Sequence, residues 1–164
     1  NGVKKYILSV TVASLVILID QATKFIIKAN FPLNKSMAVI NGFFHITHVK
    51  NTGGAFSLLS GANSLFFIIA SALALIVIFI YLAGTSNDKF WVIFSISLIA
   101  GGAIGNMIDR LRSGEVTDFI DFFFKGHHWP AFNIADTAIT TGVLIIFIDM
   151  IFSRKGKQLV SRPL

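Results

Sequence analysis

The chain has 164 residues, of which 54% are hydrophobic and only 13% are charged, and its mean hydropathy is +0.76. Soluble domains rarely have this composition, so we expect an integral membrane protein with a single domain over residues 1–164. The formal net charge of +6 does not indicate nucleic-acid binding, because the basic residues lie mostly at the ends of apolar runs. Cysteine is absent, which excludes disulfides, thiol catalysis and thiolate metal sites.

Four apolar stretches approach or reach the roughly 20 residues that a helix needs to cross a membrane. They predict spans at about residues 5–28, 65–82, 90–110 and 133–152. The first stretch alone resembles a cleavable signal peptide, but no small-residue cleavage site follows it and further spans come later. The predicted fold is therefore a four-transmembrane-helix bundle.

Apart from Lys5 at its start, the charged residues of the first span lie in its second half. Asp20 and Lys24 are four residues apart, so they share one helix face and can form an ion pair. One interpretation is an ion pair at the helix end that merely orients the span, and the other is a role in a site.

The extracytoplasmic loop at about residues 29–64 carries a hairpin signal. Asn41-Gly42 separates two apolar runs, which predicts a small β-sheet at the membrane surface. His45 and His48 have no third metal ligand placed near them, so we expect surface histidines, no metal and no cofactor. The segment beginning Asn51-Thr52-Gly53-Gly54 is either an ordinary turn or a place where backbone N–H groups approach a ligand.

The third span ends in a glycine-containing and then a polar segment. Gly101 and Gly105 predict a surface for close helix approach. Asn106, Asp109 and Arg110 bring more polarity than packing needs. A second outer loop is expected at about residues 111–132. The fourth span then begins with four polar residues at helical spacing, expected to face the bundle: Asn133, Asp136, Thr137 and Thr140.

Basic residues suggest the orientation. One predicted side has seven Lys and Arg residues in loops and tails and the other has five, which places both termini in the cytoplasm. At about 1.5 Å per residue, the polar parts of spans one, three and four reach one layer near the outer interface. Six of the eight acidic residues lie in this outer half: Asp20, Asp109, Glu115, Asp118, Asp121 and Asp136. Spacing alone does not select a reactive pair from these six.

Five blocks of the sequence resemble one family across nearly the whole chain. They are Asp20-Gln21-Ala22-Thr23-Lys24, Asn51-Thr52-Gly53-Gly54-Ala55-Phe56, Gly101-Gly102 through Gly105-Asn106 to Asp109-Arg110, Val116-Thr117-Asp118-Phe119, and Phe132-Asn133-Ile134-Ala135-Asp136. The chain resembles the lipoprotein signal peptidases, the type II signal peptidases of bacteria. Gly53-Gly54 stands where many members have Gly-Ala, a departure that affects only the local shape of the loop.

The resemblance implies an aspartyl peptidase of the bacterial cytoplasmic (inner or plasma) membrane. Such an enzyme removes the signal peptide from a prolipoprotein by cleaving before a cysteine that carries a diacylglyceryl group. The resemblance implies that Asp118 and Asp136 are catalytic, near the outer leaflet. Its supporting or substrate-binding residues are Asn106, Arg110, Asn133, Asp20, Lys24, Asn51, Gly54 and Asp109. The implied partners are the lipid-modified substrate and the phospholipid bilayer, and we expect a monomer.

The residue types agree with this chemistry independently. The sequence has no Gly-x-Ser-x-Gly elbow and no His-Glu-x-x-His zinc motif, so amide hydrolysis needs another way to activate water. Two adjacent carboxylates that share a proton provide one. Two other classes remain as alternatives: a small transporter, which needs polar access from both membrane faces, and a noncatalytic assembly or receptor subunit.

Overall fold

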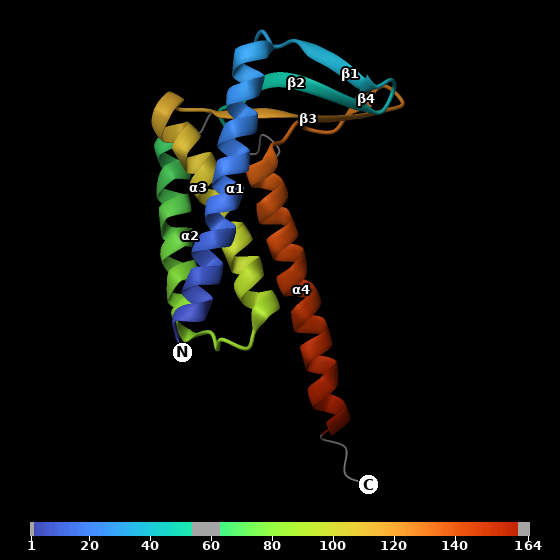
Figure 1. Cartoon of the computed structure of the whole chain (residues 1–164). Helices are drawn as coiled ribbons and strands as arrows, with labels where there is room; N and C mark the ends of the chain where they lie inside the picture. Colours follow the sequence, from blue (N-terminus) through green and yellow to red (C-terminus); the bar gives the residue numbers. More distant parts are fainter. Residues whose placement is uncertain (1, 54–62, 161–164) are drawn as a thin grey trace.

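The computed structural model describes residues 2–53 and 63–160, with side chains described as far as residue 152. Its helices are α1 (Val3–Asn30), α2 (Ser64–Gly84), α3 (Phe90–Ser113) and α4 (Ile134–Val160). All four are long and apolar enough to cross a membrane, which confirms the predicted helical membrane fold. Figure 1 shows them rising together toward a small sheet, with the start of α1 and the end of α4 at the opposite end.

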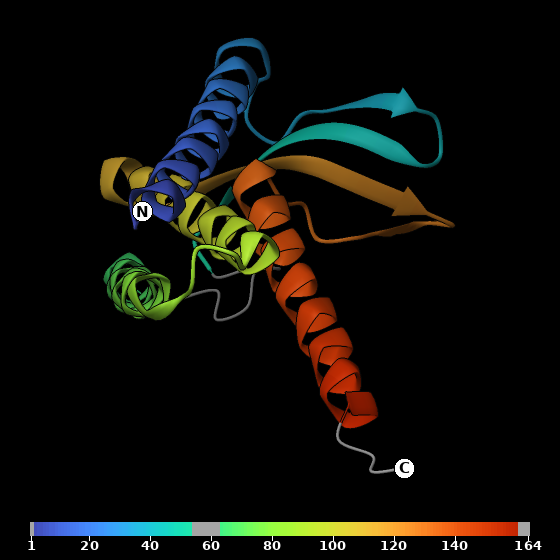
Figure 2. The same cartoon turned by 60° about the horizontal axis from the view of Figure 1, so that its bottom comes forward.

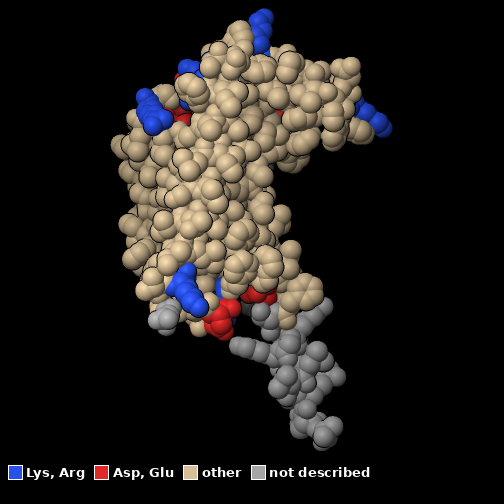
Figure 3. All heavy atoms as spheres, viewed as in Figure 1, with Lys and Arg blue, Asp and Glu red and all other residues tan. Residues whose placement is uncertain are grey.

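Charged side chains avoid the middle of the bundle. On the face shown in Figure 3, Lys, Arg, Asp and Glu gather near the two ends, and the surface between them is uncharged. Large hydrophobic side chains such as Phe25, Ile76 and Phe147 are exposed along the helices. An exposed apolar band between two charged ends is the surface that a bilayer requires.

Helix α3 lies between the other helices and approaches two of them closely through glycines. A Cβ atom at position 101 would lie 2.8 Å from the Cβ of Val16 in α1, and one at position 105 would lie 2.7 Å from a carboxylate oxygen of Asp20. These distances confirm the predicted close approach. Gly102 provides a second such contact, toward Ala135 in α4, which was not predicted.

The sheet is antiparallel, with strands β1 (Ser36–Ile40), β2 (Phe44–Asn51), β3 (Val116–Phe124) and β4 (His127–His128) in that order. The hairpin at Asn41-Gly42 is confirmed, and Gly42 adopts the positive φ of 75° that this turn needs. The outer loop predicted at about residues 111–132 contains two strands, β3 and β4, which were not predicted. The β-branched and aromatic residues of β3 favour a strand, and the tight turn at Lys125 and Gly126 returns it into β4.

Strand β3 connects the sheet to the helices. Its Ile120 exchanges backbone hydrogen bonds of 2.8 and 3.0 Å with Phe132, immediately before α4. Because side chains alternate along a strand, Asp118, Ile120 and Phe122 share one face and Asp121 lies on the other. Asp118 is therefore carried on a paired strand next to the first turn of α4.

Replacement of Gly102 by Ala is expected to destabilise the bundle, because the added methyl group would overlap the carbonyl oxygen of Ala135 and lie 2.7 Å from Cγ1 of Ile139. We expect a loss of about 1–3 kcal/mol in the free energy of unfolding. Unfolding in detergent micelles measures it. Gly84→Ala is the matched control, since a Cβ there meets nothing within 4 Å. Equal stability of the two variants would contradict close packing at Gly102.

Candidate active site

Asp118 is buried, with 1% of its surface exposed, and neutral amides hold both of its carboxylate oxygens. Asn133 donates to Oδ1 at 2.7 Å and Asn51 donates to Oδ2 at 2.9 Å. The β2–β3 register pairs Asn51 with Val116, which places Asn51 diagonally next to Asp118 on the ladder. The predicted neighbourhood of Asp118 with Asn51 and Asn133 is present in the structure.

Asp136 lies in the first turn of α4 and is half-buried. Its Oδ1 accepts a hydrogen bond of 2.8 Å from Asn106 of α3. Asn133 precedes the helix, and its side-chain oxygen accepts from the backbone N–H of Asp136 at 3.0 Å, as an N-cap residue does. The Asn133 side chain therefore caps α4 with its oxygen and binds Asp118 with its nitrogen, so that one amide joins the two aspartates.

The pKa of Asp118 is raised to about 7, because the carboxyl group is buried and because the charge of Asp136 lies nearby. The hydrogen bonds from Asn51 and Asn133 act in the opposite direction and lower it. Two carboxyl groups in one low-dielectric site do not ionise together easily. Asp118 therefore holds its proton to a higher pH than an ordinary carboxyl group does.

A buried lysine binds residues that hold the two aspartates in place. The Lys24 ammonium is 1% exposed and lies 2.8 Å from Asp20 and 3.1 Å from Asp109. It also donates to Oδ1 of Asn106 at 3.0 Å. Because that amide oxygen is occupied by a cation, the Asn106 NH₂ group is directed toward Asp136. The predicted Asp20–Lys24 ion pair is confirmed, and it is buried inside the polar layer rather than exposed at a helix end.

Asp20 and Asp109 also accept hydrogen bonds from the backbone N–H groups that directly precede the two aspartates of the pair. Asp20 accepts from the N–H of Ala135 at 3.0 Å, and Asp109 accepts from the N–H of Thr117 at 3.2 Å. Ala135 and Thr117 directly precede Asp136 and Asp118 in the sequence. Gln21, which sequence reasoning did not single out, donates to Asp20 at 3.1 Å and to Asp109 at 3.3 Å. Its adjacency to Asp20 was the only signal for it.

Arg110 holds the segment that follows β2. Its Nη2 donates to the carbonyl oxygen of Gly53 at 2.8 Å, and its guanidinium carbon lies 4.9 Å from the ring centre of Phe67 in α2. Its buried Nε has no hydrogen-bond partner among the residues described. Gly54 and the rest of the block through Phe56 lie outside the described residues.

The other acids of the outer half are engaged elsewhere. Glu115 forms an ion pair with Lys50. Asp121, on the opposite face of β3, lies 2.8 Å from Nδ1 of His128. Asp20 and Asp109 are both paired with Lys24. Within the part of the chain that the structure describes, Asp118 and Asp136 thus differ from these four acids in that asparagine side chains, and no cation, bind them.

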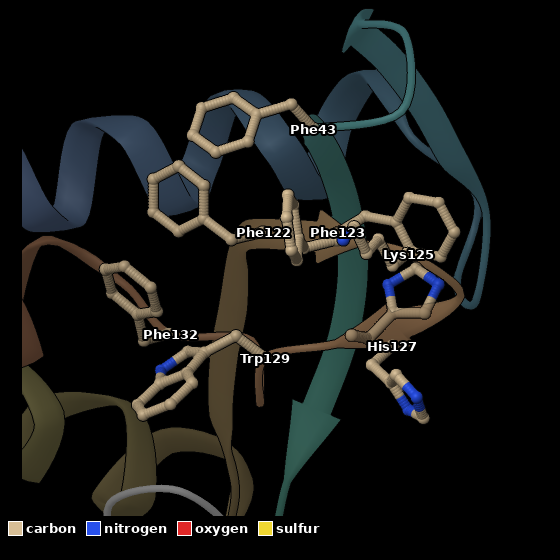
Figure 4. A pocket seen from close by; sticks show the side chains of 9 residues that line it. Phe43, Phe122, Phe123, Lys125, His127, Trp129 and Phe132 are labelled. Atoms are coloured by element: carbon tan, nitrogen blue, oxygen red, sulfur yellow. The ribbon is translucent and has the colours of Figure 1, made fainter.

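One cavity lies beside Asp136 and a second lies beside the sheet, and the two share lining residues. Asp136, Thr137 and Thr140 line a cavity of about 260 Å³ together with Trp129 and Phe132. Trp129 and Phe132 also line a cavity of about 720 Å³ under β3 and β4, and Figure 4 shows these two side chains next to each other at one end of it. The prediction that Thr137 and Thr140 face the bundle was wrong: both are exposed, because α4 packs on α3 through Ala135, Ile139 and Gly142, on another side of the helix. Figure 2 shows the later part of α4 diverging from the other helices.

The histidines of β2 differ from the expected surface pair. His48 is buried, with 7% of its surface exposed, and its Nδ1 lies 2.7 Å from the carbonyl oxygen of Phe31. The expectation of a surface position was wrong for His48, since an irregularity in the β2–β3 register between Ile46 and Val49 interrupts the alternation. His45 lies on the face of the sheet that carries Asp121.

Comparisons with known proteins agree with this geometry. The family model described as signal peptidase (SPase) II matches residues 12–152. The lipoprotein signal peptidase of Syntrophus aciditrophicus is 44% identical, over 94% of this chain and 99% of that protein. The one from Staphylococcus aureus strain JH9 is 38% identical, over 94% and 96%. A solved structure described as a bacterial membrane enzyme superposes with a TM-score of 0.85 at 36% identity, over 95% of this chain and 93% of that chain.

The match to the family model covers most of the chain and includes all of the residues that meet in the polar layer. The fold also agrees with that of a solved bacterial membrane enzyme. The chain is therefore a multi-pass bacterial membrane protein and a peptidase, and it belongs to the signal peptidase II family of lipoprotein signal peptidases.

Proposed function

We propose that this chain is an aspartic endopeptidase that removes the signal peptide from diacylglyceryl-modified prolipoproteins, with Asp118 and Asp136 as its catalytic pair. Cleavage falls immediately before the lipidated cysteine. The observation that carries the proposal is the contrast among carboxylates in one layer. Asp20 and Asp109 are ion-paired with a buried lysine, whereas the hydrogen bonds to Asp118 and Asp136 come from neutral groups, namely asparagine side chains and the backbone N–H of Asn133.

A pair that keeps one proton can act as base and acid in the same step. The ionised carboxylate removes a proton from a water molecule as that water attacks the scissile carbonyl carbon, and the protonated carboxyl donates a hydrogen bond to the carbonyl oxygen. The raised pKa of Asp118, about 7, supports a pair that remains singly protonated near neutral pH. Asparagine partners suit this exchange, because an amide binds a carboxyl group without fixing its charge.

The supporting residues have separate roles in this proposal. Asn133 and Asn106 orient the two aspartates, and Asn51 fixes the second oxygen of Asp118. Lys24, Asp20 and Asp109 hold Asn106 and the backbone on either side of the pair. Arg110 fixes the segment at Gly53, and its guanidinium is proposed to bind a substrate carbonyl or to support the residues around the pair. Gly54 belongs to the same segment and is proposed to shape it.

The substrate reaches the aspartates from the bilayer. The cavity beside Asp136 opens along the exposed Thr137 and Thr140 and is bounded by Trp129 and Phe132. A substrate whose acyl chains lie in the outer leaflet arrives at a fixed depth, which converts lipid anchoring into positioning of the peptide bond. The proposed enzyme is a monomer with both termini in the cytoplasm and its site near the outer leaflet.

Asp118→Asn and Asp136→Asn are each expected to lower the cleavage rate of a lipidated precursor by ~10²-fold or more, since each removes an acid or base group. Cleavage by purified variants, with an unlipidated precursor as the substrate control, measures this. Asp88→Asn is the matched variant, because Asp88 is exposed in the turn between α2 and α3. Near-normal turnover by either site variant would eliminate the proposed pair.

The alkaline side of the pH profile is expected to follow the proton on the pair. Asp118 loses its proton as the pH rises through about 7, so kcat/KM should fall above that pH. Asn51→Ala removes a hydrogen bond that lowers this pKa, so the fall should move to higher pH. An Asn51→Ala enzyme with reduced kcat/KM but an unshifted profile would show that Asn51 has only a structural role.

Lys24→Met is expected to destabilise the protein by about 3–5 kcal/mol, because it leaves the buried carboxylates of Asp20 and Asp109 without their cation. Lys28→Met is the matched control. Its ammonium is 44% exposed and lies 3.9 Å from Asp109, so its loss should cost at most about 1 kcal/mol. Unfolding measurements on both purified variants provide the comparison, and similar losses would refute the role assigned to buried Lys24.

A further inference from the structure

Three neighbouring strands place two imidazoles and a carboxylate on the sheet face opposite to Asp118. His45 of β2 stands directly across from Asp121 of β3, and His128 of β4 stands across from Phe123. Asp121 and Phe123 are two residues apart on β3, so all four side chains share this face. One ligand atom from each of His45, Asp121 and His128 can be chosen so that the three lie within 4.8 Å of one another.

The Asp121 carboxylate is buried and held in one orientation, which favours the binding of a cation. It is 5% exposed, and Thr47 donates to its Oδ2 at 2.9 Å, which fixes its plane. Nδ1 of His128 lies 2.8 Å from one carboxylate oxygen and 3.0 Å from the other. The nitrogen and the carboxylate therefore point at a common position, which a proton occupies when Nδ1 donates.

His45 is not accounted for by that hydrogen bond. Its ring stacks on Phe123 with centroids 5.6 Å apart and meets the His128 ring edge at 5.9 Å. Among the residues described, its imidazole makes no hydrogen bond. The hydrogen bond between His128 and Asp121 therefore does not explain why a second imidazole lies at this place.

We propose that His45, Asp121 and His128 form a binding site for a divalent transition-metal cation of the Zn²⁺ type. Metal–nitrogen and metal–oxygen bonds of ~2.0–2.2 Å in tetrahedral geometry hold ligand atoms about 3.4 Å apart. The nitrogen of His128 lies 2.8 Å from the nearer oxygen of Asp121, so this pair has to open slightly, whereas the widest spacing in the cluster, within 4.8 Å, has to close. The side chain of His128 is 55% exposed, which leaves room for this adjustment. Two imidazoles and one carboxylate suit Zn²⁺ or Cu²⁺, whereas Ca²⁺ and Mg²⁺ prefer sites made of oxygen.

The bound metal fastens β2, β3 and β4 to one another. To bind the cation through Nδ1, the neutral imidazole of His128 carries its proton on Nε2 instead of Nδ1, while the Thr47 hydroxyl continues to donate to the carboxylate. Trp129 follows His128 directly and lines both cavities beside the sheet. Metal binding thus stiffens a wall of the cavity that reaches Asp136, without any metal ligand entering the aspartate pair.

Titration calorimetry with ZnCl₂ tests the site, using a chain without a polyhistidine tag in detergent micelles. The wild-type chain should bind one Zn²⁺ with micromolar affinity or tighter and gain thermal stability, and CaCl₂ should not compete. His45→Ala and His128→Ala should each weaken Zn²⁺ binding by about tenfold or more. His127→Ala is the matched control, since the neighbouring His127 is exposed and lies outside the cluster.

Either of two results with the wild-type chain and the alanine variants would overturn the proposal. One is absence of Zn²⁺ binding by the wild-type chain. The other is a loss in His127→Ala equal to that in His45→Ala, which would indicate nonspecific binding by surface imidazoles. Thermal unfolding of each variant without metal identifies a folding defect. If His45→Ala is unstable, His45→Gln keeps the side chain polar, and normal Zn²⁺ binding by that variant would equally refute a ligand role.

Discussion

The buried ammonium of Lys24 is the interaction on which the polar layer depends. It lies between the carboxylates of Asp20 and Asp109, so α1 and α3 are joined by charges that water does not screen. Each carboxylate then accepts a backbone N–H next to one of the paired aspartates. A single cation thereby fixes where α4 begins and where β3 begins. Without it, two negative charges would remain in an apolar bundle next to two further carboxyl groups.

Two asparagine side chains connect this charged cluster to Asp118 and Asp136. Asn106 receives the Lys24 ammonium at its oxygen, and this leaves its NH₂ group to bind Asp136. Asn133 serves as the cap of α4 and as the donor to Asp118, so the helix cannot start elsewhere without losing that contact. Charged hydrogen-bonding partners are thus confined to the supporting layer, and the proposed catalytic pair, Asp118 and Asp136, is held by neutral groups that tolerate either protonation state. This division explains how adjacent carboxyl groups differ in chemistry.

Much of this arrangement could be predicted from the sequence. Apolar length indicated the helices, Asn41-Gly42 indicated the first hairpin, and the spacing of Asp20 and Lys24 indicated their ion pair. Strand β3 was not predicted within the outer loop at about residues 111–132. Without the strand, the sequence did not indicate the two faces that separate Asp118 from Asp121. The partners of Asp109 and Arg110 come from distant segments, so no local spacing could identify them.

The sheet places different chemistry on its two faces for a reason of geometry. Side chains alternate along β3, so a strand that must present Asp118 to α4 necessarily presents Asp121 and Phe123 to the other side. On that side, the two-residue strand β4 has few ladder bonds to hold it, and its residue His128 meets the buried Asp121. A polar contact there steadies the hairpin that carries Trp129 to the cavity beside Asp136. The sheet face opposite to Asp118 therefore contributes to the site without contacting it.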